Sequence, residues 1–191
     1  MSNELMGLKV AILVANGFEQ VEMLEPRKAL QEAGAKVELV SPERHTVKGW
    51  EHTEWGGTFP VEVSLENARA DDYDALMLPG GVMNPDRLRL KPEAIEFVRE
   101  FVKAEKPIAA ICHAPWTLID AGAAKGRTLT SWPSLKSDLI NAGAKWVDKE
   151  VVRDGKVVTS RKPDDIPAFN ETMIEVFAES QQQTKKGSAG S

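Results

Sequence analysis

The single cysteine of the sequence, Cys112, is the residue whose type and setting point most directly to chemistry. It follows the apolar run 108–111 and precedes Pro115, so a strand must end and a helix must begin within a few residues. A helix N-terminus and its unpaired backbone amides favour a thiolate, which predicts a lowered pKa and a nucleophilic sulfur. The alternative is an inert cysteine packed in the core, which is a common fate of free cysteines.

Two carboxylates near the first strand are candidates for tuning this sulfur. Glu19 and Glu22 are three residues apart, so they share one face at the start of the first predicted helix. A carboxyl buried beside a thiolate becomes protonated and can donate a hydrogen bond to sulfur, and two neighbouring carboxyls then titrate as a coupled pair. The alternative is that both residues simply favour the helix N-terminus.

Gly80 and Gly81 end another apolar segment, 73–81. Glycine lets the backbone approach a ligand closely, and the amides of Gly81 and His113 are candidates for holding a developing oxyanion. The alternative for the glycine pair is an ordinary strand-ending turn. His113 is a candidate base next to Cys112, although side chains of adjacent residues usually diverge.

The remaining histidines and tryptophans carry weaker signals. His45 and His52 lie in a turn-rich region and are interpreted as solvated surface groups. Trp116 and Trp132 could line a pocket or pack in the core. One cysteine and three scattered histidines predict no metal site, and no glycine loop has the spacing of a phosphate cradle, so no cofactor is expected.

The elements that must position these residues alternate between short apolar strands and helices, which predicts an α/β fold with a mostly parallel sheet and helices on both faces. Ligands of such sheets bind beyond the carboxyl ends of the strands, where the candidates above converge. In the first helix we expect an inward stripe that includes Leu24 and Leu30, with Pro26 either in an early turn or restarting the helix. We expect strands at 8–15, 37–40, 73–81 and 108–111, and a hairpin that turns at Asp154-Gly155. We expect further helices at 93–105, 115–121, 135–141 and 166–178. Residues 43–63 are expected to form an antiparallel excursion from the sheet.

Length and charge limit the classes of protein. The 191 residues predict one domain, 1–180, followed by a disordered tail, 181–191, that has no apolar anchor. The net charge of −5 with dispersed basic residues makes nucleic acid an unlikely partner, and no segment is apolar for the ~20 residues that would span a membrane. The N-terminus reads as a first strand rather than a signal peptide, and a lone cysteine fits a reducing compartment, so the cytoplasm is expected.

Four segments together resemble the PfpI-type branch, the intracellular protease and deglycase group, of the ThiJ/PfpI superfamily. They are NGFEQVEMLEP, YDALMLPGG followed by NPDRLR, KPIAAICHAPWTLIDAGAAKGRTLTSWPS and NAGAKWVDKEVVRDGKVVTSRKPDDIPAFN. The resemblance runs from about residue 8 to residue 177. It implies a flavodoxin-like three-layer sandwich with a nucleophile elbow, assembled as a homodimer or homohexamer.

The resemblance also implies roles for individual residues. His113 would pair with a carboxylate from a neighbouring subunit, here Asp86, where some relatives carry glutamate. Ala114 stands where glycine is common, which adds a methyl group beside the elbow. Cys112 would be the nucleophile, and the carboxyl of Glu22 would hydrogen-bond its sulfur, with Glu19 near the same pocket. The amides of Gly81 and His113 would form the oxyanion hole. Trp132 would be an aromatic residue of the pocket.

The implied function is a cysteine-dependent hydrolase of the stress-response kind. Deglycase or glyoxalase-like activity on methylglyoxal adducts, including glycated proteins, stands ahead of peptidase activity, and in each the thiolate attacks an electrophilic carbon. The alternative is a redox sensor or holdase chaperone in which Cys112 is oxidised. A class I glutamine amidotransferase would need a catalytic histidine late in the chain, and no histidine follows His113.

Overall fold

The computed structural model describes residues 3–188 and is built on one seven-stranded sheet. Across the sheet the order is β11-β12-β8-β7-β1-β3-β6, and every neighbouring pair is parallel except β11 with β12. The predicted mostly parallel sheet is therefore confirmed. Its strands are β1 (Lys9–Leu13), β3 (Lys36–Ser41), β6 (Val63–Ser64), β7 (Ala75–Leu78), β8 (Ile108–Ile111), β11 (Val151–Asp154) and β12 (Val157–Ser160).

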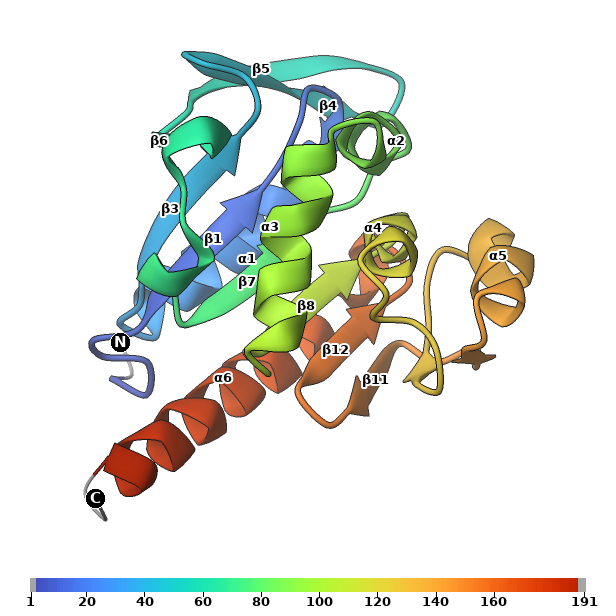
Figure 1. Cartoon of the computed structure of the whole chain (residues 1–191). Coiled ribbons are helices and arrows are strands. Elements are labelled where there is room, and N and C mark those ends of the chain that lie inside the picture. The colour runs from blue at the N-terminus through green and yellow to red at the C-terminus, as the bar shows by residue number, and fades with distance from the viewer. Residues whose placement is uncertain (1–2, 189–191) are drawn as a thin grey trace.

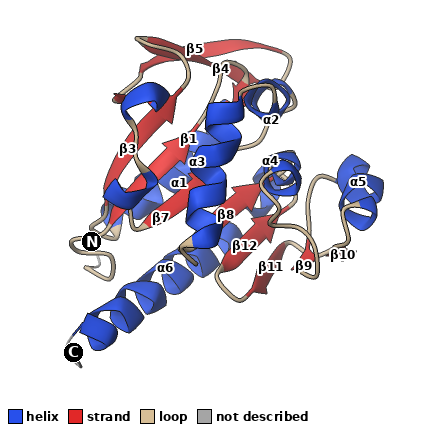
Figure 2. Ribbon diagram, viewed as in Figure 1, coloured by secondary structure: helices blue, strands red, loops and turns tan. Residues whose placement is uncertain are grey.

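Helices cover both faces of this sheet, as Figures 1 and 2 show. One hydrophobic cluster joins the sheet to α2 (Met83–Arg89), α3 (Pro92–Lys103) and α4 (Pro115–Asp120). A second cluster joins the opposite face to α1 (Gln20–Glu32) and α6 (Ile166–Ser188). The central strands are buried on both sides, which is why β1 reads as a nearly continuous apolar run. The flavodoxin-like sandwich is confirmed.

Two small sheets lie outside the central one. β2 (Phe18–Glu19), β4 (Thr46–Glu51) and β5 (Glu54–Pro60) form the antiparallel excursion that the sequence predicts, with β2 added in parallel to β4. β9 (Thr128–Leu129) pairs with β10 (Lys145–Trp146), and α5 (Lys136–Asn141) lies between them in the chain. No described helix is long and apolar enough to cross a membrane.

The first helix buries a different face from the predicted one. Met23, Pro26 and Leu30 are buried, whereas Leu24 is 37% exposed, so its place in the inward stripe was wrong. Pro26 lies inside the helix and has no N–H to donate to the carbonyl four residues earlier. The buried face also carries Glu22, which apolar patterning cannot select.

The last helix is longer than the sequence predicts. It continues past residue 178 to Ser188, and the Gln181 amide donates to the Met6 carbonyl (3.0 Å). The disorder expected from residue 181 is therefore not found up to residue 188, and residues 189–191 lie outside the described part of the chain. Glutamine and lysine are good helix formers, so an existing helix can propagate through them without an apolar anchor.

Candidate active site

The candidate residues meet at the carboxyl edge of the sheet, around the ends of β1, β7 and β8. β1 pairs with β3 on one side and β7 on the other, so the strand order reverses beside β1. At such a point the loops that leave neighbouring strands diverge and open a crevice. The turn with Gly17 and Glu19 leaves β1, the Gly80-Gly81 loop leaves β7, and Cys112 follows β8.

Cys112 adopts a backbone conformation that few residues other than glycine tolerate. Its φ is +64°, in the left-handed region, which costs roughly 1–2 kcal/mol for a residue with a Cβ. Backbone hydrogen bonds from Cys112 N to the Ser160 carbonyl (3.0 Å) and from Trp132 N to the Cys112 carbonyl (2.8 Å) hold it. This sharp strand-to-helix turn has the form of a nucleophile elbow.

Glu22 and Gly80 pack directly against the cysteine. The Gly80 N–H donates to Glu22 Oε2 (2.9 Å). A Cβ on Gly80 would lie 2.5 Å from Glu22 Oε2 and 2.6 Å from the Cys112 Cβ, so no side chain fits there. Gly81, with φ +79°, is equally confined, because a Cβ would meet the Glu19 amide nitrogen at 2.7 Å. Neighbouring atoms therefore approach both backbone positions too closely for any residue other than glycine.

Glu22 is a fully buried acid. Burial, and then the negative charge of Glu19, raise its pKa from 4.5 to about 8, against opposing hydrogen bonds from the Cys112 thiol and from the Gly80 and Gly81 amides. At neutral pH the carboxyl is mostly protonated. Oε1 has no hydrogen-bond partner among the described residues, so a proton on this oxygen is not engaged elsewhere.

The sulfur does not have the lowered pKa that its position predicts. Burial raises the pKa of the Cys112 thiol, and negative charge on Glu22 raises it further; the Gly81 and His113 amides oppose both effects. Cys112 is only 6% exposed, and α4 has only six residues, so its dipole is small. Protonation of Glu22 removes its charge, which leaves burial as the main obstacle to the thiolate.

His113 lies against the sulfur instead of diverging from it. Its Nδ1 is 3.2 Å from Cys112 Sγ, and burial lowers its pKa to about 4, so the ring is neutral at pH 7 and can accept a proton. The ring stacks on Trp132 (5.7 Å between centroids) and meets the Trp116 edge (5.3 Å). Ala114 has φ −56°, a helical value that needs no glycine.

A cavity of about 610 Å³ opens onto these groups. Trp50, His52 and Met83 line it in addition to the predicted residues, and sequence reasoning missed them as site residues. The strand register explains why Trp50 reaches the cavity. Glu19 of β2 pairs directly with Trp50 of β4, which brings the β4–β5 hairpin over the site. The full lining is Gly17, Glu19, Glu22, Trp50, His52, Gly81, Val82, Met83, Cys112, His113, Trp132 and Pro163.

Asn84 is a further residue that sequence reasoning missed. It is fully buried, and its Oδ1 accepts from the Ala15 amide (2.7 Å). Its Nδ2 donates to the carbonyls of Pro79 (2.9 Å) and Gly80 (3.2 Å). The side chain thus ties the loop after β7 to the end of β1. A polar residue just after a Gly-Gly turn is the signal that could have found it.

Asp86 is not brought to the site within one chain. It is exposed on α2 and does not line the cavity. Its expected pairing with the histidine of a neighbouring subunit therefore stays a prediction.

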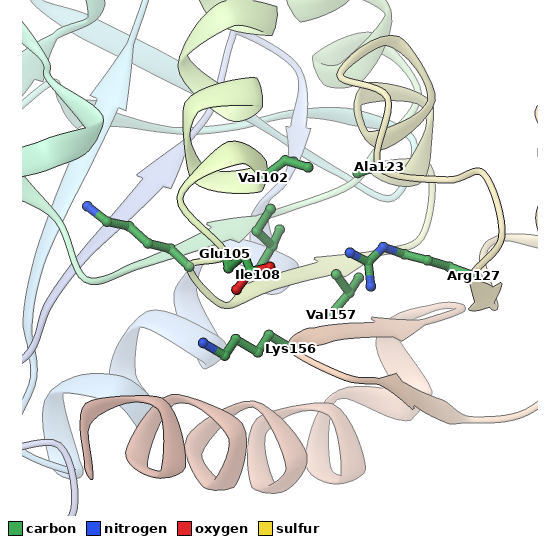
Figure 3. A pocket seen from close by; sticks show the side chains of 8 residues that line it. Val102, Glu105, Ile108, Ala123, Arg127, Lys156 and Val157 are labelled. Carbon is green, nitrogen blue, oxygen red and sulfur yellow. The ribbon is translucent and has the colours of Figure 1, made fainter. Parts of the chain in front are cut away.

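A second cavity, of about 280 Å³, lies at the opposite end of the strands. Figure 3 shows Arg127 and Lys156 beside Val102, Ile108 and Val157. It contains no nucleophile paired with a base, so it does not compete for the chemistry. Within residues 3–188, no cluster of three or more acidic, histidine or cysteine side chains is arranged to hold a metal ion.

An α/β sandwich with a cysteine elbow, an adjacent histidine and a buried carboxyl defines a known class of protein. The chain matches the DJ-1/PfpI family over residues 8–176 and belongs to it. It is 41% identical over 170 residues to the Pyrococcus horikoshii protein named deglycase PH1704, covering 89% of this chain and 99% of that protein. It is 40% identical over 172 residues to Bacillus subtilis YraA, whose name assigns it provisionally as a cysteine protease, covering 90% and 99%.

Solved structures support the same fold. Drosophila melanogaster DJ-1beta superposes with a TM-score of 0.82 at 31% identity, covering 95% of this chain and 97% of that one.

Proposed function

We propose that the chain is a cysteine-dependent hydrolase in which Cys112 attacks an electrophilic carbon. Deglycase or glyoxalase-like activity on methylglyoxal adducts is the first assignment, and peptidase activity is the second. The observation that carries the proposal is the contact of Cys112 Sγ with His113 Nδ1 (3.2 Å) at a strained elbow that opens into a cavity. The deglycase name of a relative covered along nearly its whole length supports the order of the two activities.

His113 is assigned as the base. The neutral ring takes the thiol proton on Nδ1 as the sulfur attacks, and it returns the proton to the leaving group. Burial disfavours the imidazolium that forms in between. A carboxylate beside the ring would offset this cost, which is the physical reason to expect Asp86 from a second subunit in a homodimer or homohexamer.

Glu22 and two backbone amides are assigned to the negative charges of the reaction. The protonated Glu22 carboxyl donates to the sulfur, so the thiolate forms without a second anion beside it. The amides of Gly81 and His113, which point at the sulfur, are available to the oxyanion that develops on the substrate. For an adduct, the amine or thiol is the leaving group that takes the proton from His113, and water then cleaves the sulfur–carbon bond and releases the methylglyoxal-derived fragment; for a peptide, the amine leaves first and water releases the new carboxyl end.

The test compares hydrolysis of methylglyoxal adducts and of a denatured protein substrate by the wild type and by Cys112→Ser. We expect the variant to lose at least about 100-fold in kcat/KM, since a serine hydroxyl beside His113 is a far weaker nucleophile. Val82→Ala, at an exposed residue of the cavity rim, is the control for general disturbance of the site. Equal rates for wild type and Cys112→Ser at matched folding stability would end the hydrolase assignment.

Oxidation of Cys112 is the second candidate, and the buried Glu22 proton favours it. Peroxide would oxidise the thiolate to a sulfenate and release water, and a second peroxide would give the sulfinate. A protonated Glu22 Oε1, which has no hydrogen-bond partner among the described residues, can donate to the new sulfur oxygen. Mass spectrometry after mild peroxide treatment tests this role, and an unmodified Cys112 would exclude it.

A further inference from the structure

The cavity that opens onto the elbow also combines one carboxylate with aromatic rings. Glu19 supplies the negative charge, and this charge contributes to the raised pKa of Glu22. Trp50 is its directly paired neighbour across β2 and β4, and directly paired residues present their side chains on the same face. Trp132 lines the same cavity and is 38% exposed.

Both the carboxylate and the ring beside it are held in place by the hairpin. The His52 amide approaches Glu19 Oε1 (3.4 Å), and the Trp50 indole N–H donates to the His52 carbonyl (2.9 Å). Trp50 also packs edge-on against Trp55, with 5.4 Å between ring centroids. A carboxylate and an indole fixed side by side need little reordering when a ligand binds.

No lysine or arginine is among the residues that line this cavity. The cations of the surrounding elements are engaged elsewhere: Lys48 stands over the Trp55 ring (5.4 Å), and Arg87 donates to the Asn16 carbonyl (3.2 Å).

We propose that this part of the cavity binds a positively charged group, an ammonium or guanidinium, carried by the substrate next to the carbon that Cys112 attacks. Glu19 attracts the charge, and the indole faces of Trp50 and Trp132 accept it through cation–π contacts. The preferred substrates are then adducts or peptides with a cationic side chain at the reacting position. This inference rests on the proposed function and names its substrate class.

The test uses two methylglyoxal hemithioacetals that differ only in charge. One is formed with thiocholine, which carries a trimethylammonium group, and the other with 3,3-dimethylbutane-1-thiol, its neutral carbon isostere. We expect the wild type to prefer the cationic adduct by about tenfold in kcat/KM, the effect of roughly one favourable charge interaction. Glu19→Gln should reduce this preference at least fivefold, and Trp50→Leu should also reduce it.

The preference is a ratio measured on one enzyme at one pH, so changes in the reactivity of Cys112 cancel. Glu171→Gln, which removes one exposed carboxylate from α6, is the charge-matched control and should leave the ratio unchanged. An unchanged ratio in Glu19→Gln, or no preference in the wild type, overturns the inference.

Binding of choline to Cys112→Ser, followed by ligand-observed NMR, separates this inference from the hydrolase assignment. Choline should bind better than 3,3-dimethylbutan-1-ol, and adding Glu19→Gln should remove the difference. If Cys112→Ser keeps full turnover while this charge-dependent binding persists, the hydrolase assignment fails and the cation site stands. If neither ligand is preferred, the cation site fails whatever the turnover.

Discussion

Replacing Glu22 by glutamine should stabilise the protein at neutral pH, although it alters the site. The carboxyl is fully buried, and its pKa is raised from 4.5 to about 8. A glutamine has the same shape, keeps an oxygen that can accept the Gly80 N–H, and has no charge to bury. The substitution therefore removes a group whose ionisation the folded state resists.

The sign and size of the change in stability follow from proton linkage. The folded protein holds the Glu22 proton more tightly than the unfolded chain, so the stability it contributes is complete below about pH 4.5 and is lost as the pH rises towards 8. Each pH unit in this window costs about 1.4 kcal/mol. Between pH 5 and pH 7.5 the advantage of Glu22→Gln over wild type should grow by about 3 kcal/mol.

The contribution of His113 to stability changes with pH in the opposite direction, but it does so in both the wild type and the variant. Its pKa is lowered from 6.5 to about 4, so its contribution to stability rises with pH across that interval. The difference between variant and wild type cancels it and isolates Glu22.

The assay is urea denaturation of both proteins at pH 5, 6, 7 and 7.5, followed by tryptophan fluorescence. Glu25→Gln removes an exposed carboxylate from the same helix and is the matched control. A Glu22→Gln advantage that changes by less than about 1 kcal/mol over this range would show that Glu22 is not held protonated by burial. Its role as proton donor to the sulfur would then fall as well.

Three further substitutions test the geometry of the site. Gly80→Ala should destabilise the fold by about 1–3 kcal/mol and abolish turnover, because a Cβ would lie 2.6 Å from both the Cys112 Cβ and the Ile111 carbonyl; a soluble variant with normal melting would contradict this. Asn84→Ala should cost about 3 kcal/mol and lower kcat, since it leaves the buried Ala15 amide and Pro79 carbonyl without a partner and removes one of the two donors to the Gly80 carbonyl; chemical denaturation and turnover measure both. Asp86→Ala should lower turnover without unfolding the protomer; unchanged peptidase and deglycase rates in an intact oligomer would remove the borrowed carboxylate.

Local patterns were sufficient to predict most of the framework. The apolar runs that became β1, β7 and β8 are buried on both faces, and such strands are recognisable because nearly every position is apolar, Lys9 at the start of β1 being the exception. The face of α1 was not predictable in the same way. Leu24 fits an apolar stripe but is exposed, whereas Glu22 is buried because it packs against Gly80, which is 58 residues away in the chain, and against the cysteine.

The end of α6 shows the same limit. A tail without apolar residues reads as unfolded, yet a long helix that is already packed at Phe169 and Phe177 can extend through glutamines at little cost.

The sequence alone determined where a nucleophile could stand. A lone cysteine lies between a buried strand and a proline, and glycines and acids follow the neighbouring strands, so the topology of an α/β sheet brings all of them to one edge. Only the tertiary structure decided the electrostatics of that nucleophile. Burial and the contact with Glu22 reverse the direction in which a short helix would shift the thiol pKa, because desolvation of a charge outweighs the field of a six-residue dipole. The register of β2 with β4, which brings Trp50 and His52 over the cysteine, is likewise a property of the folded chain.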